Sequence, residues 1–321
     1  MKETRQKEKA VLVLDTGDLF FKKYSKPYLA EDREREIQRA HLILKSLNVM
    51  GFDAIGIGDD DLSLGIDFLL KMSREAQFPI LSSNLVDAKS EKLLFEPYLI
   101  KEVGGLRVGI FSLLSPDVFL SQTDERRKGF ILRDPIETAR NMATELKPKV
   151  DLLVLLSHLS YPNDVQLAQT VSGIHIIAGG HSGVHLTSPP VIKDTVILQS
   201  SGKGMYGGKL TLNLFNPNSG FYNTSTKRTL EGNILKNKTR LRSVHAPEFE
   251  KARLEKTNED NEKKLKELQD MNPFTNTLSP IDGQIKDDPE IRKRVDAYQV
   301  KYPVKKESPS HDSRGTYIPK P

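Results

Sequence analysis

Four short apolar runs, each ending in or followed by a polar residue of metal-binding type, constrain most strongly how this chain folds. They are VLVLD (11–15), DAIGIG (53–58), DLLVLLSH (151–158) and IHIIAGGH (174–181). Apolar runs of this length are typical of buried strands. Segments with helical periodicity separate them, at about residues 31–50, 66–76, 135–147 and 163–170. Repeated strand–helix–strand units predict an α/β fold with a substantially parallel sheet.

Three further segments complete the regular part of the chain. LLFEPYLIKEVGGLRVGIFSLL (93–114) predicts a hairpin that turns at Gly104 and Gly105. TVILQS (195–200) and KLTLNLF (209–215) predict two late strands. We expect these elements to form one domain over residues 1–245.

The character of the sequence changes after about residue 216. We interpret the basic stretch that continues to Arg242 as a solvated surface strand or loop. Residues 247–271 and about 287–300 predict charged helices with thin apolar stripes, so residues 246–301 are expected to form a helical extension. The tail over 302–321 contains Pro and Ser and is predicted to be disordered.

Composition excludes several kinds of protein and site. The net charge is only +5 over 321 residues, so we expect no nucleic-acid partner, although a small anionic ligand is compatible with it. The absence of cysteine excludes disulfides and thiolate metal ligands. No apolar run approaches the roughly 18 residues that a transmembrane helix needs, and the first residues do not resemble a signal peptide.

The ends of the four apolar runs carry the candidate functional residues Asp18, Asp59, His158 and His181. Ligands bind α/β sheets beyond the carboxyl ends of their strands, so these side chains are expected at one edge of the sheet. Carboxylate and imidazole groups suit zinc, manganese or iron. A single histidine at a strand end is more often structural, but four such residues together predict a metal or phosphate site.

Six segments occur in an order that resembles the metallophosphoesterase (calcineurin-like) domain of the bacterial 5′-nucleotidase family. They are LDTGDLF, MGFDAIGIGDDDLSLGIDFL, FPILSSNL, LRVGIFSLLSP, LLVLLSHLS and VSGIHIIAGGHSGVHL, spread over about residues 11–215. The resemblance implies a four-layer α/β sandwich, with two mixed sheets flanked by helices and two metals at one sheet edge. In that family, Asp18 would match the carboxylate that bridges both metals. Asp59, His158 and His181 would match the remaining ligands of the second metal.

Other positions depart from the family pattern. The D-x-H motif that supplies first-metal ligands, and the first strand that carries it, have no counterpart before VLVLD. Gly183 replaces the second His of G-G-H-S-H. Asp60 replaces the His of G-N-H-E, which the resemblance implies assists the reacting phosphate, and Asp61 stands at the Glu position. The retained positions suggest a site for one divalent metal and a phosphoester hydrolase with weak or altered activity.

Two alternatives to this function remain open. One is a non-catalytic, metal-stabilised binding or scaffold protein, and the charged helices after residue 246 could then contact a protein partner. The other is a two-metal phosphohydrolase completed by residues upstream of the given start. An upstream segment would also allow an export signal and a periplasmic or exported protein; otherwise a cytoplasmic location is expected. The family's C-terminal nucleotide-binding domain has no counterpart after Phe215, so no basis for nucleotide specificity is visible.

Overall fold

A computed structural model describes residues 1–242 and 247–303. Its largest sheet has six strands in the order β4-β5-β7-β8-β10-β9. In that order the strands span Tyr98–Val103, Leu106–Leu114, Leu152–His158, Ile176–Gly179, Thr195–Leu198 and Val191–Ile192. The inner strands β5, β7, β8 and β10 are parallel, and β4 and β9 are antiparallel edges. The hairpin predicted to turn at Gly104 and Gly105 is confirmed.

The inner strands are buried on both faces, which explains their unbroken apolar sequences. Phe111 pairs with Leu155, and both pack toward helices α4 (Pro135–Leu146) and α5 (Tyr161–Thr170). The next pair, Ile110 and Val154, points to the opposite face and joins a second apolar cluster. Successive side chains of a strand alternate between faces, so the sheet is covered on both sides.

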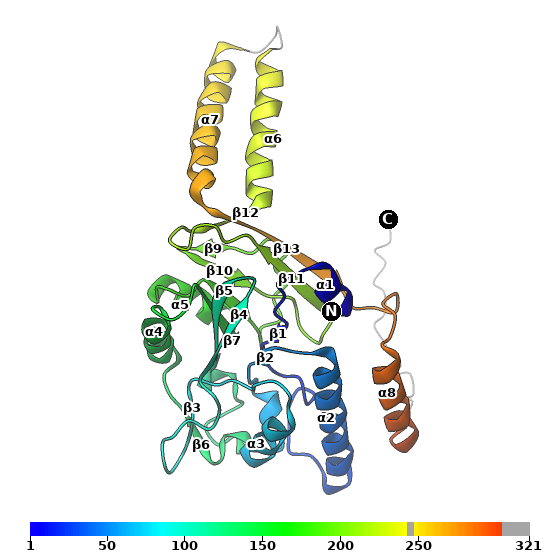
Figure 1. The fold of residues 1–321 in the computed structure, drawn as a ribbon. Coiled ribbons are helices and arrows are strands. Elements are labelled where there is room, and N and C mark those ends of the chain that lie inside the picture. Colours follow the sequence, from blue (N-terminus) through cyan, green and yellow to red (C-terminus); the bar gives the residue numbers. More distant parts are fainter. Residues whose placement is uncertain (243–246, 304–321) are drawn as a thin grey trace, which may run out of the picture.

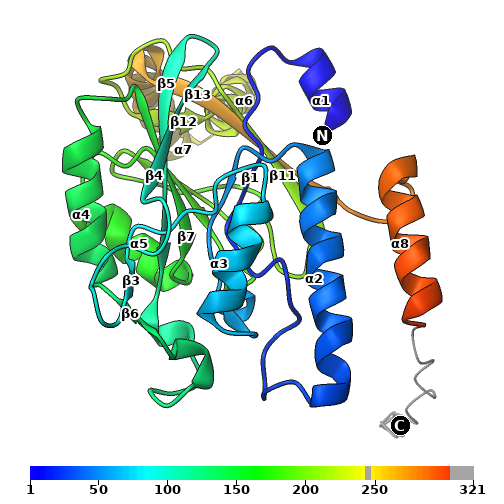
Figure 2. The ribbon, with the colours of Figure 1, turned by 60° about the horizontal axis from the view of Figure 1, so that its bottom comes forward.

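The second face packs against smaller sheets and then against helices. A three-stranded sheet has the order β11-β13-β12, and the short parallel pair β1-β2 lies beside it. These strands span Tyr206–Leu212, Asn272–Pro280, Phe221–Asn223, Leu14–Asp15 and Ala54–Ile55, respectively. Helices α2 (Ala30–Met50) and α3 (Ile66–Glu75) cover the β2 side (Figures 1 and 2). This arrangement is the expected α/β sandwich with mixed sheets.

The remaining elements are short or peripheral. They are α1 (Lys2–Lys7), α8 (Pro289–Lys301), the antiparallel pair β3 (Leu85–Asp87) and β6 (Phe130–Leu132), and the 3₁₀ turns η1 (Asp60–Leu62), η2 (Pro116–Val118), η3 (Glu125–Arg127) and η4 (Leu268–Asp270). Helix α8 lies beside α2, where the hydroxyl of Tyr298 donates to the carbonyl of Arg35 at 3.3 Å (Figure 2). The tail predicted to be disordered lies, from residue 304 on, outside the described residues.

The interpretation of the stretch through Arg242 as a surface strand or loop is wrong. After β12 it forms helix α6 (Thr224–Leu241), which runs beside α7 (Glu248–Glu267) as a hairpin directed away from the sheets (Figure 1). Ile234 and Leu254 are buried along this hairpin, and Asn237 donates to Asn258 at 3.0 Å. A mostly polar sequence with one thin apolar stripe needs a partner helix to become stable, and α7 provides it.

Strand β13 was not predicted from the sequence. It lies between β11 and β12, antiparallel to the first and parallel to the second. Its buried Phe274 fills the core between the sheets. The expected division at residue 245 therefore falls between the two helices of one hairpin, and the chain returns to the sheet after it.

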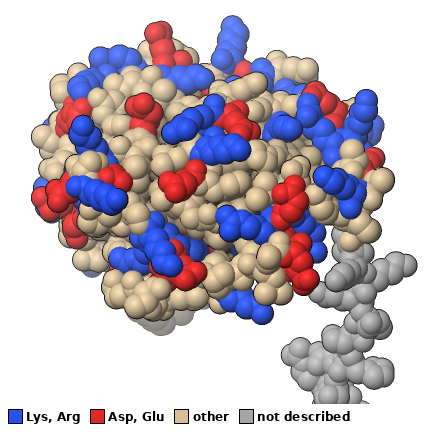
Figure 3. Space-filling view, turned by 90° about the horizontal axis from the view of Figure 1, so that it is seen from below, with Lys and Arg blue, Asp and Glu red and all other residues tan. Residues whose placement is uncertain are grey.

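Within residues 1–242 and 247–303, every helix is too short or too polar to cross a bilayer. On the face drawn in Figure 3, basic and acidic side chains are interspersed rather than gathered into one patch.

Candidate metal centre

Two pairs of parallel strands bring the four predicted site residues together. β1 and β2 are parallel, and the loops that follow them carry Asp18 and Asp59. β7 ends at His158, and the loop after its parallel neighbour β8 carries His181. One ligand atom from each of the four lies within 4.8 Å of the others. Residues as far apart in the sequence as Asp18 and His181 therefore form one cluster.

The atoms that face one another suit a cation. Nε2 of His158 lies 3.2 Å from Oδ2 of Asp18 and 3.4 Å from Oδ1 of Asp59. Nδ1 of His181 lies 3.3 Å from the same oxygen of Asp59. Among the described residues, Asp59 Oδ1 and His158 Nε2 are buried without a hydrogen-bond partner. Buried polar atoms are nearly always satisfied, so a pair of unsatisfied atoms at the centre of a donor cluster fits a metal ion.

The backbone orients His158 for this task. Its Nδ1 lies 2.9 Å from the carbonyl oxygen of Thr16, to which an Nδ1–H group donates. This leaves the Nε2 lone pair directed at the cluster, an arrangement typical of metal-binding histidines. Burial disfavours its charged form, but Asp18 and Asp59 outweigh burial and raise the pKa of His158 well above its ordinary value. In the absence of a cation, a proton on His158 therefore balances the carboxylates.

Two of the four residues have unusual backbone conformations. Asp18 has a φ of 61° and His181 a φ of 64°, in the left-handed region that non-glycine residues rarely adopt. Strained conformations of this kind concentrate at binding and catalytic sites, where the surrounding structure enforces them. Their occurrence at two residues of the cluster supports a functional role for it.

Glycines allow the first two loops to approach closely. Gly17 has a φ of 99°, and a Cβ built on it would lie 2.1 Å from the backbone nitrogen of Gly58. A Cβ on Gly58 would lie 2.1 Å from Oδ1 of Asp18. Any larger residue at either position would separate Asp18 from Asp59.

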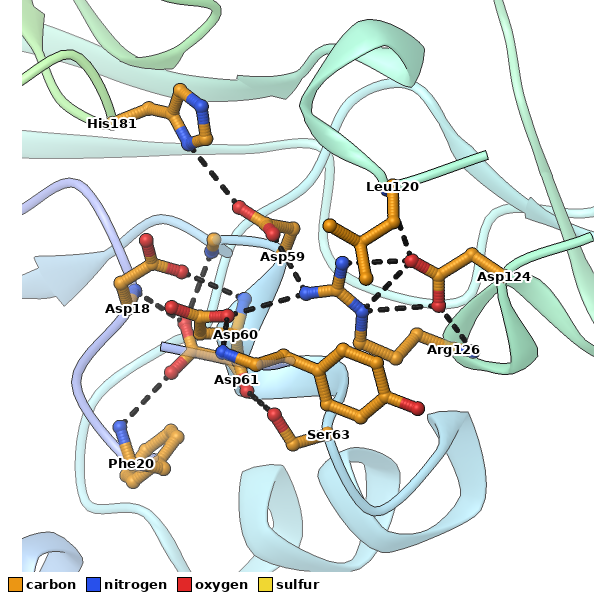
Figure 4. Close-up of polar contacts among 12 residues, drawn as sticks. Asp18, Phe20, Asp59, Asp60, Asp61, Ser63, Leu120, Asp124, Arg126 and His181 are labelled. Atoms are coloured by element: carbon orange, nitrogen blue, oxygen red, sulfur yellow. Dashed lines mark hydrogen bonds and ion pairs between the residues drawn. The ribbon is translucent and has the colours of Figure 1, made fainter. Parts of the chain in front are cut away.

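Arg126 contacts the candidate site but was not among the residues predicted from the sequence. Its Nη1 donates to Oδ2 of Asp59 at 2.7 Å and lies 3.2 Å from Oδ1 of Asp60. Figure 4 shows Asp59 between His181 and Arg126. Burial disfavours the charge of Asp59, but His158, His181 and Arg126 together hold the pKa of Asp59 below its ordinary value. No motif marked Arg126, because its loop joins the site only in the folded chain.

The three consecutive aspartates have different roles. Only Asp59 is part of the four-residue cluster. Asp60 accepts the backbone N–H of Tyr24 at 2.7 Å and pairs with Arg126. Burial is the largest cause that raises the pKa of Asp60 to about 6.

Asp61 binds the backbone of the neighbouring loop. Its carboxylate accepts the N–H groups of Asp18 and Phe20 (Figure 4) and of Leu19 at 2.8–3.0 Å, and a fourth from Gly58 at 3.0 Å. These bonds satisfy donors that the tight loop leaves without partners. Asp61 therefore fixes the backbone that presents Asp18.

A second buried network supports the loop of His181. Asp164 is fully buried and contacts the hydroxyl of Ser157, while Gln199 donates to its other oxygen at 3.2 Å. Gln199 in turn accepts from the hydroxyl of Ser182 at 2.9 Å. Burial raises the pKa of Asp164 to about 7. Gly183, where the family pattern has its second histidine, has no side chain that could bind a metal.

Comparisons with known proteins agree with this architecture. No family model matches the chain. The 5′-nucleotidase of Vibrio cholerae is 31% identical over 176 residues, which are 50% of this chain and 32% of that protein. The chain thus spans about a third of the length of this curated relative.

Solved structures share the fold over nearly the whole chain. A 5′-nucleotidase precursor from Thermus thermophilus matches with a TM-score of 0.59 and 22% identity, covering 94% of this chain and 51% of that one. The calcineurin-like phosphoesterase YfkN from Bacillus subtilis matches with a TM-score of 0.63 and 16% identity, covering 94% and 86%. The resemblance seen in the sequence is confirmed: the relatives of this chain are 5′-nucleotidases and calcineurin-like phosphoesterases, and it has their fold.

Proposed function

We propose that this chain is a phosphoester hydrolase domain of the 5′-nucleotidase type that holds one divalent transition metal. The observation that carries the proposal is the pair of buried, unsatisfied atoms Asp59 Oδ1 and His158 Nε2, which face each other at 3.4 Å. The relatives of the chain are phosphoesterases by name, which supports the reaction class. The substrate class is a phosphoester.

The donor set agrees with a transition metal. Asp18 and Asp59 supply two negative charges, which balance a dication, and His158 and His181 supply two imidazole nitrogens. Mixed carboxylate and imidazole ligands suit zinc, manganese or iron better than calcium or magnesium, which prefer oxygen alone. When bound, such a metal polarises a phosphoryl oxygen and lowers the pKa of a coordinated water.

The residues around the cluster support the proposal that hydrolysis is weak. Asp60 stands at the position of the family's assisting histidine, so no imidazole is present there. Its carboxylate instead accepts the backbone N–H of Tyr24 and pairs with Arg126. Loss of a positioned acid or base typically lowers a rate on the order of 10²–10⁴-fold. Gly183 leaves no ligand for a second metal at its position, and one metal cannot stabilise both the attacking and the leaving oxygen.

A non-catalytic, metal-stabilised binding protein is the second candidate. The ion pair between Asp60 and Arg126 favours the binding protein, because it engages the Asp60 carboxylate, which stands at the position of the family's assisting histidine. Both candidates require the same metal ligands and differ only in turnover.

Metal content and turnover of the purified chain test the proposal together. We expect one zinc, manganese or iron ion per chain by elemental analysis after loading, and slow metal-dependent release of phosphate from a nucleoside monophosphate. One metal without turnover above the Asp18→Ala control would support the binding protein. Two metals with rapid turnover would contradict the one-metal site, and no bound metal would refute both candidates.

A further inference from the structure

We infer that Arg126 is a positioning residue that orients Asp59 toward the cation, an inference that rests on the proposed metal site. Arg126 comes from η3, far in sequence from the four candidate ligands. Its side chain is 2% exposed, so it reaches no free solute. Within residues 1–242 and 247–303, its charged contacts are to the carboxylates of Asp59, Asp60 and Asp124.

The two carboxylate oxygens of Asp59 have different partners, and the guanidinium of Arg126 contacts only one of them. Nη1 of Arg126 donates to Oδ2 at 2.7 Å, which fixes the plane of the carboxylate. The other oxygen, Oδ1, then faces Nε2 of His158 at 3.4 Å and Nδ1 of His181 at 3.3 Å. Hydrogen bonds to the outer oxygen of a ligating carboxylate typically set its orientation and the affinity of a metal site. Without Arg126, Asp59 would be free to turn Oδ1 away from the histidines.

Asp124 anchors the guanidinium from the opposite side. Nη2 of Arg126 donates to Asp124 Oδ2 at 2.8 Å, and Nε donates to Oδ1 at 3.1 Å. Asp124 also accepts the backbone N–H of Arg126 at 3.0 Å, so it holds both ends of the residue. The ring of Tyr24 packs against the guanidinium, with its centroid 4.3 Å from Cζ. The arginine is therefore fixed before a cation binds.

The shape of arginine is needed for this role. Its planar fork donates to Asp59 and Asp124 in two directions at once, whereas the lysine ammonium is a compact point charge. Arg126 also compensates the buried charges of Asp59, Asp60 and Asp124. Arg126→Lys keeps the positive charge but removes the planar guanidinium, so it distinguishes the positioning of Asp59 from the balance of buried charge.

Cobalt binding to three variants tests the inference. Co²⁺ is titrated into wild type, Arg126→Gln, Arg126→Lys and the control Arg127→Gln, and both the dissociation constant and the visible absorption spectrum are recorded. Arg127 is the adjacent residue of η3. Its guanidinium lies 5.4 Å from the centroid of the Phe119 ring and forms no ion pair within the described part of the chain. We expect Arg126→Gln to weaken Co²⁺ binding by about 10- to 100-fold and to shift the spectrum, the range typical of lost outer-shell partners. Arg127→Gln should bind as wild type does.

Circular dichroism establishes that each variant is folded. If Arg126→Gln does not fold, Arg126→Lys decides, because it retains the charge; we expect weaker binding and an altered spectrum. Wild-type affinity and spectrum in the folded Arg126→Lys or Arg126→Gln variant would overturn the inference and leave the metal site intact. A wild-type chain that binds no Co²⁺ would instead refute the proposed function.

Discussion

Nε2 of His158 and Oδ1 of Asp59 lie 3.4 Å apart in the interior, and among the described residues neither has a hydrogen-bond partner. A buried group left unsatisfied costs about 1–3 kcal/mol, and more when it is charged. Both atoms belong to the cluster that also contains Asp18 and His181. The fold thus maintains an arrangement that is unfavourable until a cation or a proton occupies it.

Asp18→Ala is expected to abolish binding of a divalent cation at this cluster. Oδ2 of Asp18 faces His158 at 3.2 Å, and its removal takes away one of the two charges that balance a dication. The measurement is metal content by elemental analysis after dialysis. Asp117→Ala, an exposed aspartate of η2 outside the cluster, serves as the control and should retain the metal. Retention of metal by folded Asp18→Ala would refute the ligand assignment.

Cation binding is expected to release protons at neutral pH. Burial disfavours the charged form of His158, but its two carboxylate neighbours outweigh burial and raise its pKa above the ordinary value, so the apo site carries a proton on Nε2. A metal must displace that proton. Affinity should therefore fall as the pH is lowered. Calorimetry of Zn²⁺ binding in two buffers with different ionisation enthalpies measures the number of protons, and identical heats in both would contradict the prediction.

Gly17→Ala is expected to weaken cation binding strongly. The new Cβ would lie 2.1 Å from the nitrogen of Gly58, so the loops of Asp18 and Asp59 must separate. Gly51→Ala is the matched control. Gly51 also has a positive φ, of 71°, but a Cβ there would meet nothing within 4 Å. Both variants lose stability through backbone strain, and only Gly17→Ala should lose metal affinity, which titration with Co²⁺ measures. Equal affinity in the two variants would argue against the close approach.

Asp164→Asn is expected to be more stable, relative to wild type, at high pH than at low pH. Burial raises the pKa of Asp164 from 3.8 to about 7. The stability that the protonated carboxyl provides is therefore complete below about pH 4 and is lost as the pH rises to 7, by at most about 4 kcal/mol. Asparagine stays neutral throughout. Urea unfolding of wild type and Asp164→Asn at pH 5 and pH 8 should show the variant gaining relative stability at pH 8, and a pH-independent difference would exclude a neutral Asp164.

Ile234→Ala is expected to loosen the α6–α7 hairpin. Ile234 is 9% exposed, and its truncation should cost about 2 kcal/mol, the lower end for a buried aliphatic side chain, because only one partner helix surrounds it. Hydrogen exchange of α6 amides should accelerate. Leu235→Ala removes a side chain that is 69% exposed and should leave exchange unchanged. Similar acceleration in both variants would show that the hairpin is not held by this stripe.

The sequence predicted the sheet better than the segments around it. The apolar runs that became β5, β7 and β8 are buried on both faces, so their local composition alone identifies them. Helix α6 and strand β13 carry few apolar residues, and each is stabilised by a distant element: α6 by α7, and β13 by β11 and β12. The ends of the apolar runs and the order of motifs identified Asp18, Asp59, His158 and His181 as candidates. Because each follows the carboxyl end of a predicted strand, the sequence also predicted that they would lie close together.

What the sequence determined by itself is therefore the α/β architecture and the identity of the four clustered residues, because strand periodicity and strand ends are local features. Only the tertiary structure decided the role of each aspartate in GDDD. Asp59 faces two histidines, Asp60 meets Arg126, and Asp61 binds four backbone N–H groups. Three identical side chains differ in this way because charge balance and hydrogen bonding depend on which distant groups the fold brings within about 3 Å.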